Sequence, residues 1–360
     1  MQVNPSVYAP FDSPEEYIRE WTDLIWEDYG LGRLGEHYAA NMTAHGAYGP
    51  IRSMETVLRN SLVKKSAFPN RVGTAEDVIC EARGQDAFVS HHRVFHSGPQ
   101  QGMWDYGAPG SKESESRNIA VCLVRAGLVE EEWVVRDEWR VLATLGLDPE
   151  SIARRTAFTD EPGGLFGTSA PSNVVAVGES GPRPKTHREE AEMIRDFIGT
   201  VWGQRHLEKV SDYTHRDLFL ETTRARIRTR LRNYQSDLVQ MLAPFPDALV
   251  EVRDIAVNTA PEQGTRISVL WRMAGTYCGA PLYGPLTQSP IEILGASQFL
   301  LRGGKIIHEW RVFDEVAVMA QIARARGDEP TPADRQRDEV GVLAQVATIR
   351  EDESSSTARR

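Results

Sequence analysis

Residues 90–96 carry three histidines, His91, His92 and His96, in a run whose composition predicts a β-strand. Side chains alternate between the two faces of a strand, so His92, Val94 and His96 share one face. Positions four apart on a strand lie about 13 Å from each other, too far for one metal ion, so acid–base work or hydrogen bonding to a substrate is favoured. A metal-dependent enzyme using all three histidines is a weaker alternative, and simple exposure to solvent is another.

A second pattern occurs twice, as Glu-Trp followed four residues later by Asp, at residues 132–137 and 309–314. Aspartate is a favoured helix N-cap, and both Asp137 and Asp314 precede apolar stretches. We therefore expect each aspartate to begin a terminal helix.

The interval between the two copies of this Glu-Trp pattern recurs between other pairs of residues along the chain. Ile18, Trp21, Ile25 and Trp26 align with Ile194, Phe197, Val201 and Trp202, and Phe-Pro-Asn at 68–70 aligns with Phe-Pro-Asp at 245–247. A nearly constant interval between several separated pairs of matching residues does not arise by chance. The two halves of the chain are therefore diverged copies of one domain. The predicted domains are 1–158 and 187–325, with a Gly/Pro/Ser-rich linker over 159–186 and a charged tail over 326–360 that has room for a short helix at 339–349.

The elements of each copy follow the same order. Ser13 and Thr186 are positioned to cap an opening amphipathic helix, and a second helix is predicted over 54–64 and over 225–241. Strands dominate afterwards, and the last two of each copy meet at a glycine-containing turn, which predicts an antiparallel hairpin. Helices followed by strands indicate an α+β fold in which the helices cover one face of a curved, mostly antiparallel sheet.

This order of elements, the Phe-Pro-Asp helix stop and the closing Gly-Lys-Ile-x-x-Glu-Trp-x3-Asp of residues 304–314 resemble the SnoaL-like polyketide (ester) cyclases. These belong to the nuclear transport factor two-like superfamily, with ketosteroid isomerase and scytalone dehydratase. The resemblance covers both copies and implies two tandem cone-shaped α+β barrels. It also implies an acid–base site, because aldol closure needs a group that removes a proton next to a carbonyl. Members of this superfamily use the cone for different reactions or for binding alone.

The resemblance places the aspartates after each tryptophan, Asp137 and Asp314, among the candidate acid–base groups. It adds His45, which falls where many members of this superfamily have a cavity histidine. Because Ile306 and Trp310 are the large apolar side chains of their strand, we expect their face to point inward together with His308. The aligned positions of the first copy are Val129, Glu131 and Trp133. The predicted catalytic residues are His308, Asp314, Asp137, His92 and His45, and the predicted substrate-binding residues are Trp310, Trp133, Glu131, His96, Trp271, Arg272 and Tyr277.

The two copies differ in chemistry, because the second has no counterpart of the histidine cluster. This asymmetry suggests that one copy catalyses while the other binds or only supports it. Residues 222–232 hold five arginines, which we interpret as a solvated helix face pairing with acidic residues of the other copy rather than as an anion or nucleic-acid site.

The composition and net charge of the chain limit the kinds of partner that it can bind. The 51 acidic and 41 basic residues give a net charge of −10, which disfavours nucleic acid and anionic membranes. The three cysteines have no zinc or disulfide spacing, and neither a signal peptide nor an 18-residue apolar run occurs, so a cytoplasmic protein is expected. We expect the copies to pair sheet against sheet within the chain as a pseudo-dimer, and further homodimerisation stays open.

The sequence thus favours a cofactor-independent cyclase, isomerase or lyase that acts by general acid–base catalysis on a hydrophobic oxygenated small molecule, polyketide-, steroid- or aromatic-like, with no metal or cofactor. No Walker or Rossmann motif contradicts this expectation. A non-catalytic small-molecule-binding or scaffold protein of the same fold is the alternative.

Overall fold

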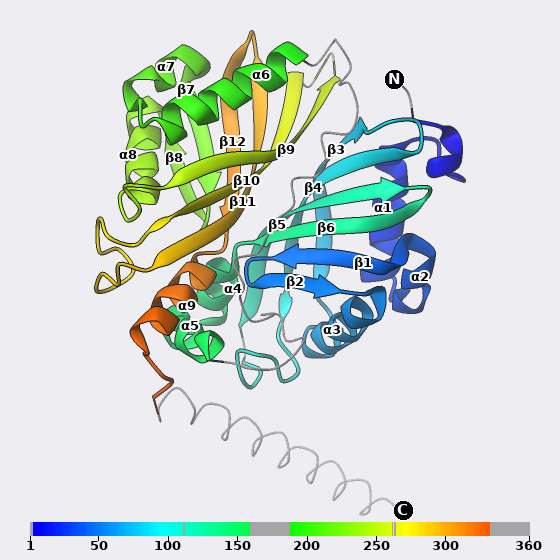
Figure 1. The fold of residues 1–360 in the computed structure, drawn as a ribbon. Helices are drawn as coiled ribbons and strands as arrows, with labels where there is room; N and C mark the ends of the chain where they lie inside the picture. The colour runs from blue at the N-terminus through cyan, green and yellow to red at the C-terminus, as the bar shows by residue number, and fades with distance from the viewer. Residues whose placement is uncertain (1–2, 111, 159–187, 261, 263, 332–360) are drawn as a thin grey trace, which may run out of the picture.

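A computed structural model of the chain describes residues 3–110, 112–158, 188–260, 262 and 264–331 (Figure 1). The expected linker over 159–186, Thr186 and the expected helix over 339–349 lie outside these residues. Two six-stranded sheets follow one another along the chain, with strand orders β2-β1-β6-β5-β4-β3 and β8-β7-β12-β11-β10-β9. The predicted α+β class and the duplication of one topology are confirmed. The sheets are curved and open, with edge strands on both sides, rather than closed barrels.

The first repeat contains five helices and six strands in its described part. They are α1 (Pro14–Thr22), α2 (Leu34–His37), β1 (Tyr38–Gly46), β2 (Gly49–Arg52), α3 (Met54–Ala67), β3 (Val72–Ala82), β4 (Ala87–Pro99), β5 (Glu113–Arg125), β6 (Leu128–Arg136), α4 (Glu138–Leu145) and α5 (Pro149–Ala157). Strands β1 and β6 pair in parallel, whereas the other neighbours are antiparallel.

The second repeat has the same plan. Its elements are α6 (Arg188–Phe197), α7 (Val210–Tyr213), β7 (Thr214–Thr222), β8 (Arg226–Thr229), α8 (Leu231–Leu242), β9 (Leu249–Ala260), β10 (Gly264–Thr276), β11 (Pro290–Arg302), β12 (Lys305–Phe313) and α9 (Glu315–Arg326). The prediction of helix over 225–241 is wrong at its start, because residues 226–229 form a hairpin strand and the helix begins at Leu231.

Local signals in the sequence form the expected caps and turns. The Ser13 hydroxyl accepts a hydrogen bond from the backbone of Glu16 and begins α1, as predicted. The β5–β6 turn has positive φ at Ala126 and Gly127, and the β11–β12 turn has positive φ at Gly303 and Gly304. Two consecutive residues with positive φ are typical of the tight turns whose twist matches an antiparallel hairpin.

A β-bulge in the closing strand of each repeat decides which side chains face inward. The register shifts between Val129 and Glu131 in β6, and at the corresponding place between Ile306 and His308 in β12. A bulge adds one residue and so reverses the alternation of faces beyond it. Val129 and Glu132 therefore share the concave face, although they are three residues apart. Trp133 packs on the opposite face.

The convex faces of the two sheets pack against each other. Apolar residues of both repeats form one cluster there, including Val121 and Trp133 from the first and Leu270 and Val312 from the second. A buried polar group lies in the same interface: Arg83 contacts Asp254 at 2.9 Å, and His91 contacts Asp254 at 2.8 Å and Ser268 at 3.0 Å. His91 thus faces the second repeat, away from His92 and His96.

The last helix of the second repeat also crosses to the first. Helix α9 packs against α4 and α5 in a shared apolar cluster that includes Leu142, Ile152 and Met319, and the three helices lie together below the sheets in Figure 1. This crossing brings the beginning of α9, and Asp314 with it, to the concave side of the first sheet.

Candidate functional site

The concave side of the first sheet holds a cavity of about 220 Å³. Its walls come from β1, α3, β4, β5 and β6, and its lining includes Asp314 from the second repeat. A concave cavity with an apolar lining and a few convergent polar groups is the usual form of a small-molecule site.

Strand register arranges the side chains on the concave face of the sheet in three rows. Ser90, Cys122 and Glu132 are cross-strand neighbours in the first row. His92, Ala120 and Val134 form the second row, and Val94, Asn118 and Arg136 form the third. Successive rows lie about 6.7 Å apart along the strands. Glu132 and Arg136 are therefore about 13 Å apart along β6, with apolar side chains between them.

Glu132 is the carboxylate of the first row. Its Oε1 accepts a hydrogen bond from the Tyr38 hydroxyl at 3.2 Å, and the Cys122 thiol lies at 3.8 Å. Burial raises the pKa of Glu132, whereas Arg136 and the Tyr38 hydrogen bond act in the opposite direction. A carboxylate whose pKa lies above its ordinary range is suited to accept a proton near neutral pH.

Two of the three clustered histidines line this cavity, as the strand alternation predicted. Burial lowers the pKa of His92 to about 4, helped by the neighbouring His91. Burial also lowers the pKa of His96 well below its ordinary value, as do the nearby cations Arg71, Lys64 and Arg136. Both imidazoles are therefore neutral at pH 7 and offer one donor and one acceptor each.

The corresponding rows of the second repeat are filled by large side chains. Trp271 and Phe313 flank Gly295 in the row that matches Val94, Asn118 and Arg136. The Trp271 ring lies directly over Gly295, where a Cβ atom would be 2.1 Å from the ring. Trp271 and Tyr234 are fully buried in the core of this repeat, and their first-repeat counterparts are valines. The second cone is thus occupied by its own core.

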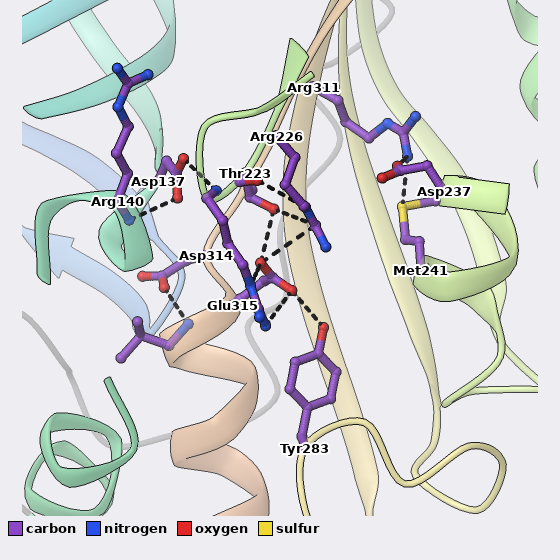
Figure 2. A network of polar contacts seen from close by, with 12 residues as sticks. Asp137, Arg140, Thr223, Arg226, Asp237, Met241, Tyr283, Arg311, Asp314 and Glu315 are labelled. Atoms are coloured by element: carbon purple, nitrogen blue, oxygen red, sulfur yellow. Dashed lines mark hydrogen bonds and ion pairs between the residues drawn. The ribbon is translucent and has the colours of Figure 1, made fainter. Parts of the chain in front are cut away.

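The carboxylate equivalent to Glu132 is held in place by hydrogen bonds. Glu309 is 0% exposed and accepts hydrogen bonds from Tyr234 at 2.5 Å, Ser297 at 3.0 Å and Arg311 at 2.9 Å. Arg311 also contacts Asp237 at 3.2 Å (Figure 2). A buried carboxylate whose hydrogen-bond partners are all supplied by the protein is fixed in place and has no free lone pair directed at a ligand. Glu132, by contrast, lines open space.

Asp137 and Asp314 are N-caps, as their positions predicted. Asp137 accepts from the backbone N–H of Arg140 at 3.2 Å and also from that of Arg224, in the other repeat, at 2.9 Å (Figure 2). Asp314 accepts from the backbone of Val316 and Ala317. Burial raises the pKa of Asp137 to about 6, and burial with the nearby Glu138 raises the pKa of Asp314 well above its ordinary value. Asp314 lines the first repeat's cavity rather than its own.

The arginine-rich segment 222–232 forms a hairpin around these caps rather than a solvated helix face. Arg224 and Arg226 surround Glu315, with the Thr223 and Tyr283 hydroxyls donating to the same carboxylate (Figure 2). Arg224 also lies 3.5 Å from the centre of the Trp139 ring in the first repeat. The pairing carboxylate belongs to the same repeat, contrary to the expectation that the arginines meet acidic residues of the other copy.

The bulges overturn the predicted inward face of β6 and β12. His308 and Trp310 lie on the convex face, stacked on each other at 3.6 Å, with Arg93 of the first repeat over Trp310. The His308 Nε2 atom lies 3.2 Å from Glu221. Trp133 is buried between the sheets and Glu131 is beside it on the convex face, so neither faces the cavity as we expected.

His45 is among the residues that border the cavity, but its ring stacks on Trp133, on the convex face, with the ring centroids 4.9 Å apart. Neither of its nitrogens has a hydrogen-bond partner, and burial lowers its pKa to about 4.

The remaining candidates of the second repeat have structural contacts. Trp271 fills the second cone. Arg272 forms an ion pair with Glu292 at 2.7 Å and lies partly exposed. The Tyr277 hydroxyl donates to the Gly284 carbonyl at 2.6 Å and fixes a loop. None of these three residues, predicted to bind substrate, is among those that line the first repeat's cavity.

Within the described ranges, no group of three or more histidine, cysteine or acidic residues has a geometry that could hold a metal ion. The histidine cluster is divided, because His91 faces the sheet interface while His92 and His96 face the cavity.

Sequence reasoning missed Glu132 together with three cations that line the cavity: Lys64, Arg71 and Arg136. The recurrence of Glu-Trp in both copies marked Glu132. A strict period of two, however, placed it on the wrong face.

Comparison with known proteins finds a family match within the second repeat. Residues 192–322 match the family of SnoaL-like polyketide cyclases. No curated protein matches the sequence. Among solved structures, a candidate SnoaL-like polyketide cyclase from Jannaschia sp. CCS1 is 16% identical over 40% of this chain and 97% of its own, with a TM-score of 0.34. IdmH, a candidate polyketide cyclase from Streptomyces antibioticus, is 18% identical over 38% of this chain and 99% of its own, with a TM-score of 0.33.

A protein from Catenulispora acidiphila DSM 44928, described as having a ketosteroid isomerase-like fold, is 14% identical over 36% of this chain and 91% of its own, with a TM-score of 0.30.

No helix in the described part of the chain is long and apolar enough to cross a membrane.

Proposed function

Because residues 192–322 form a SnoaL-like domain and the first repeat has the same topology, we propose that the chain is a tandem SnoaL-like enzyme whose first repeat alone is catalytic. The reaction is a cofactor-independent cyclisation, isomerisation or elimination on a hydrophobic oxygenated small molecule. One contrast carries the proposal: Glu132 faces an open cavity, whereas Glu309, at the same position of the second repeat, is held by three hydrogen bonds.

In this mechanism Glu132 removes a proton from a carbon next to a carbonyl group. Neutral His92, in the adjacent row, donates a hydrogen bond to the enolate oxygen that forms. Glu132 then returns the proton. Delivery to another carbon gives isomerisation, delivery to the alkoxide of a new ring gives cyclisation, and delivery to a departing hydroxyl gives dehydration. Stabilising the enolate in a cavity that excludes water is the larger share of such catalysis.

Deuterium exchange tests the base directly, without knowledge of the natural substrate. The protein is incubated in D2O with 2-tetralone, a bicyclic ketone with acidic α-protons, and deuterium uptake is followed by mass spectrometry. We expect Glu132→Gln to lose the protein-dependent exchange by roughly 10²–10⁴-fold, the usual contribution of a general base. Glu131→Gln is the matched control, because the same change one residue earlier lies on the convex face and leaves exchange intact.

The pH profile gives a second readout. Exchange rises as Glu132 loses its proton, and burial places this midpoint above the ordinary value of 4.5 for glutamate. If Glu132→Gln exchanges deuterium as fast as the wild type, Glu132 is not the base. A cavity that binds the ketone without accelerating exchange identifies a binding protein instead.

A further inference from the structure

Three cations from separate elements converge at one end of the first repeat's cavity. Lys64 comes from α3, Arg71 from the segment before β3 and Arg136 from the end of β6, and all three line the cavity. Burial lowers the pKa of Lys64 and of Arg71, and the neighbouring positive charges lower both further, because Arg136 and Arg71 act on Lys64 and Arg136 acts on Arg71. Positive groups held together despite this repulsion are typical of a site that receives an anion.

Polar atoms at the same end lack hydrogen-bond partners. In the row formed by Val94, Asn118 and Arg136, the Asn118 Oδ1 and Arg136 Nε atoms are buried and unpaired. The Nδ1 of His96 and the Nε1 of Trp104, both in the cavity lining, are unpaired as well. Native proteins rarely leave such atoms without a partner, so this cluster indicates the place of a polar ligand group.

The carboxylates in the lining do not cancel this charge. By formal count the lining has four basic residues and four acidic ones, the latter being Glu27, Glu132, Glu138 and Asp314. Glu132 lies in a different row, at the other end of the cavity, and burial raises the pKa of Glu138 and of Asp314 and so favours their neutral form. Guanidinium groups keep their charge at neutral pH, and the pKa of Arg71, although lowered by burial, is about 10. The Arg136 end is therefore positive.

The rest of the lining is apolar. Trp26, Ile51 and Phe68 belong to this lining, and Ala120 and Val134 form the row between Arg136 and Glu132. We propose that the cavity takes an amphiphilic organic acid, whose carboxylate binds Arg136 and Arg71 and whose ring-bearing body extends towards Glu132. This inference rests on the proposed function and specifies its substrate class. The spacing of about 13 Å along β6 leaves room for a body of roughly two fused rings between the acid group and the base.

Calorimetric titration of the full chain with 2-naphthoate and with its methyl ester tests the inference, because the two probes share the naphthalene body and the ester lacks the negative charge. We expect the acid to bind at least tenfold more tightly than the ester. Arg136→Gln and Arg71→Gln each remove this preference while leaving ester binding unchanged, and Arg136→Lys retains part of it. Arg59→Gln, on an exposed position of α3, changes net charge equally and leaves both affinities unchanged.

Equal binding of acid and ester by the wild type overturns the inference, as does an acid preference that survives both arginine substitutions in folded protein. The deuterium exchange assay with 2-tetralone, which carries no acid group, is independent of this result. Loss of the acid preference with intact Glu132-dependent exchange refutes only the substrate class. Absence of exchange refutes the proposed function.

Discussion

Filling the cavity of the first repeat with the side chains that fill the second repeat tests the proposal that only the first repeat is catalytic. Val94 and Asn118 correspond to Trp271 and Gly295 in strand register. The double substitution Val94→Trp/Asn118→Gly therefore places an indole in the row between His92 and His96. Because this ring would occupy the space that a ligand needs, we expect 2-tetralone exchange and 2-naphthoate binding to fall by at least 100-fold.

The size of the steric effect follows from the second repeat. A Cβ atom at Gly295 would lie 2.1 Å from the Trp271 ring, so Val94→Trp alone drives its ring into Asn118. Such overpacking costs about 1–3 kcal/mol of stability. Adding Asn118→Gly removes the collision, while a glycine within a strand costs about 0.5–1 kcal/mol. The double variant should thus be more stable than Val94→Trp alone by up to about 2.5 kcal/mol, a non-additivity expected only of residues in contact.

Urea unfolding of the two single variants and the double variant measures this coupling, and calorimetry with 2-naphthoate measures the accompanying loss of binding. Additive effects on stability would show that the two positions do not meet as their counterparts do. Wild-type binding by the folded double variant would place the ligand site elsewhere, and the proposed catalytic role of the first cone would be refuted.

Two further predictions concern the second cone and the cap that joins the repeats. Trp271→Val removes a fully buried indole ring and should lower the free energy of unfolding by about 3–4 kcal/mol. We expect the rate of 2-tetralone exchange to stay unchanged, and loss of exchange in folded protein would contradict the supporting role of this repeat. Asp137, whose pKa is raised by burial to about 6 from 3.8, resists ionisation in the folded state, so its stabilising effect is complete below pH 3.8 and is lost as the pH rises through 6. Asp137→Asn keeps a capping oxygen and should therefore gain up to about 3 kcal/mol relative to the wild type between pH 4 and pH 6.5; a parallel pH dependence of the two proteins in urea unfolding would refute this.

The sequence predicted several features because each depends on neighbouring residues. The capping of α1 by Ser13 and of α9 by Asp314 needs only a side-chain oxygen two or three residues before a free N–H group. The shared face of His92 and His96 follows from uninterrupted alternation in β4. Strand β8, in contrast, lies in a segment for which the sequence predicts helix, because its arginines have no intrinsic strand preference. Arg226 meets Glu315 only in the folded protein.

The sequence by itself determined the duplication, the α+β order of elements, the turns and caps, and the unequal chemistry of the two copies, since these follow from residue type and local spacing. Tertiary structure decided which face of β6 is concave, because one bulge reverses the alternation and turns Glu132, rather than Glu131, towards the cavity. It also decided which cone is open. Strand register places Val94 opposite Asn118 and Trp271 opposite Gly295, and only this placement shows that the tryptophan fills the second cone while the valine leaves the first one open. Finally, only the packing of α9 against α4 and α5 brings Asp314 into the lining of the other repeat, since contacts between distant segments depend on how whole elements pack.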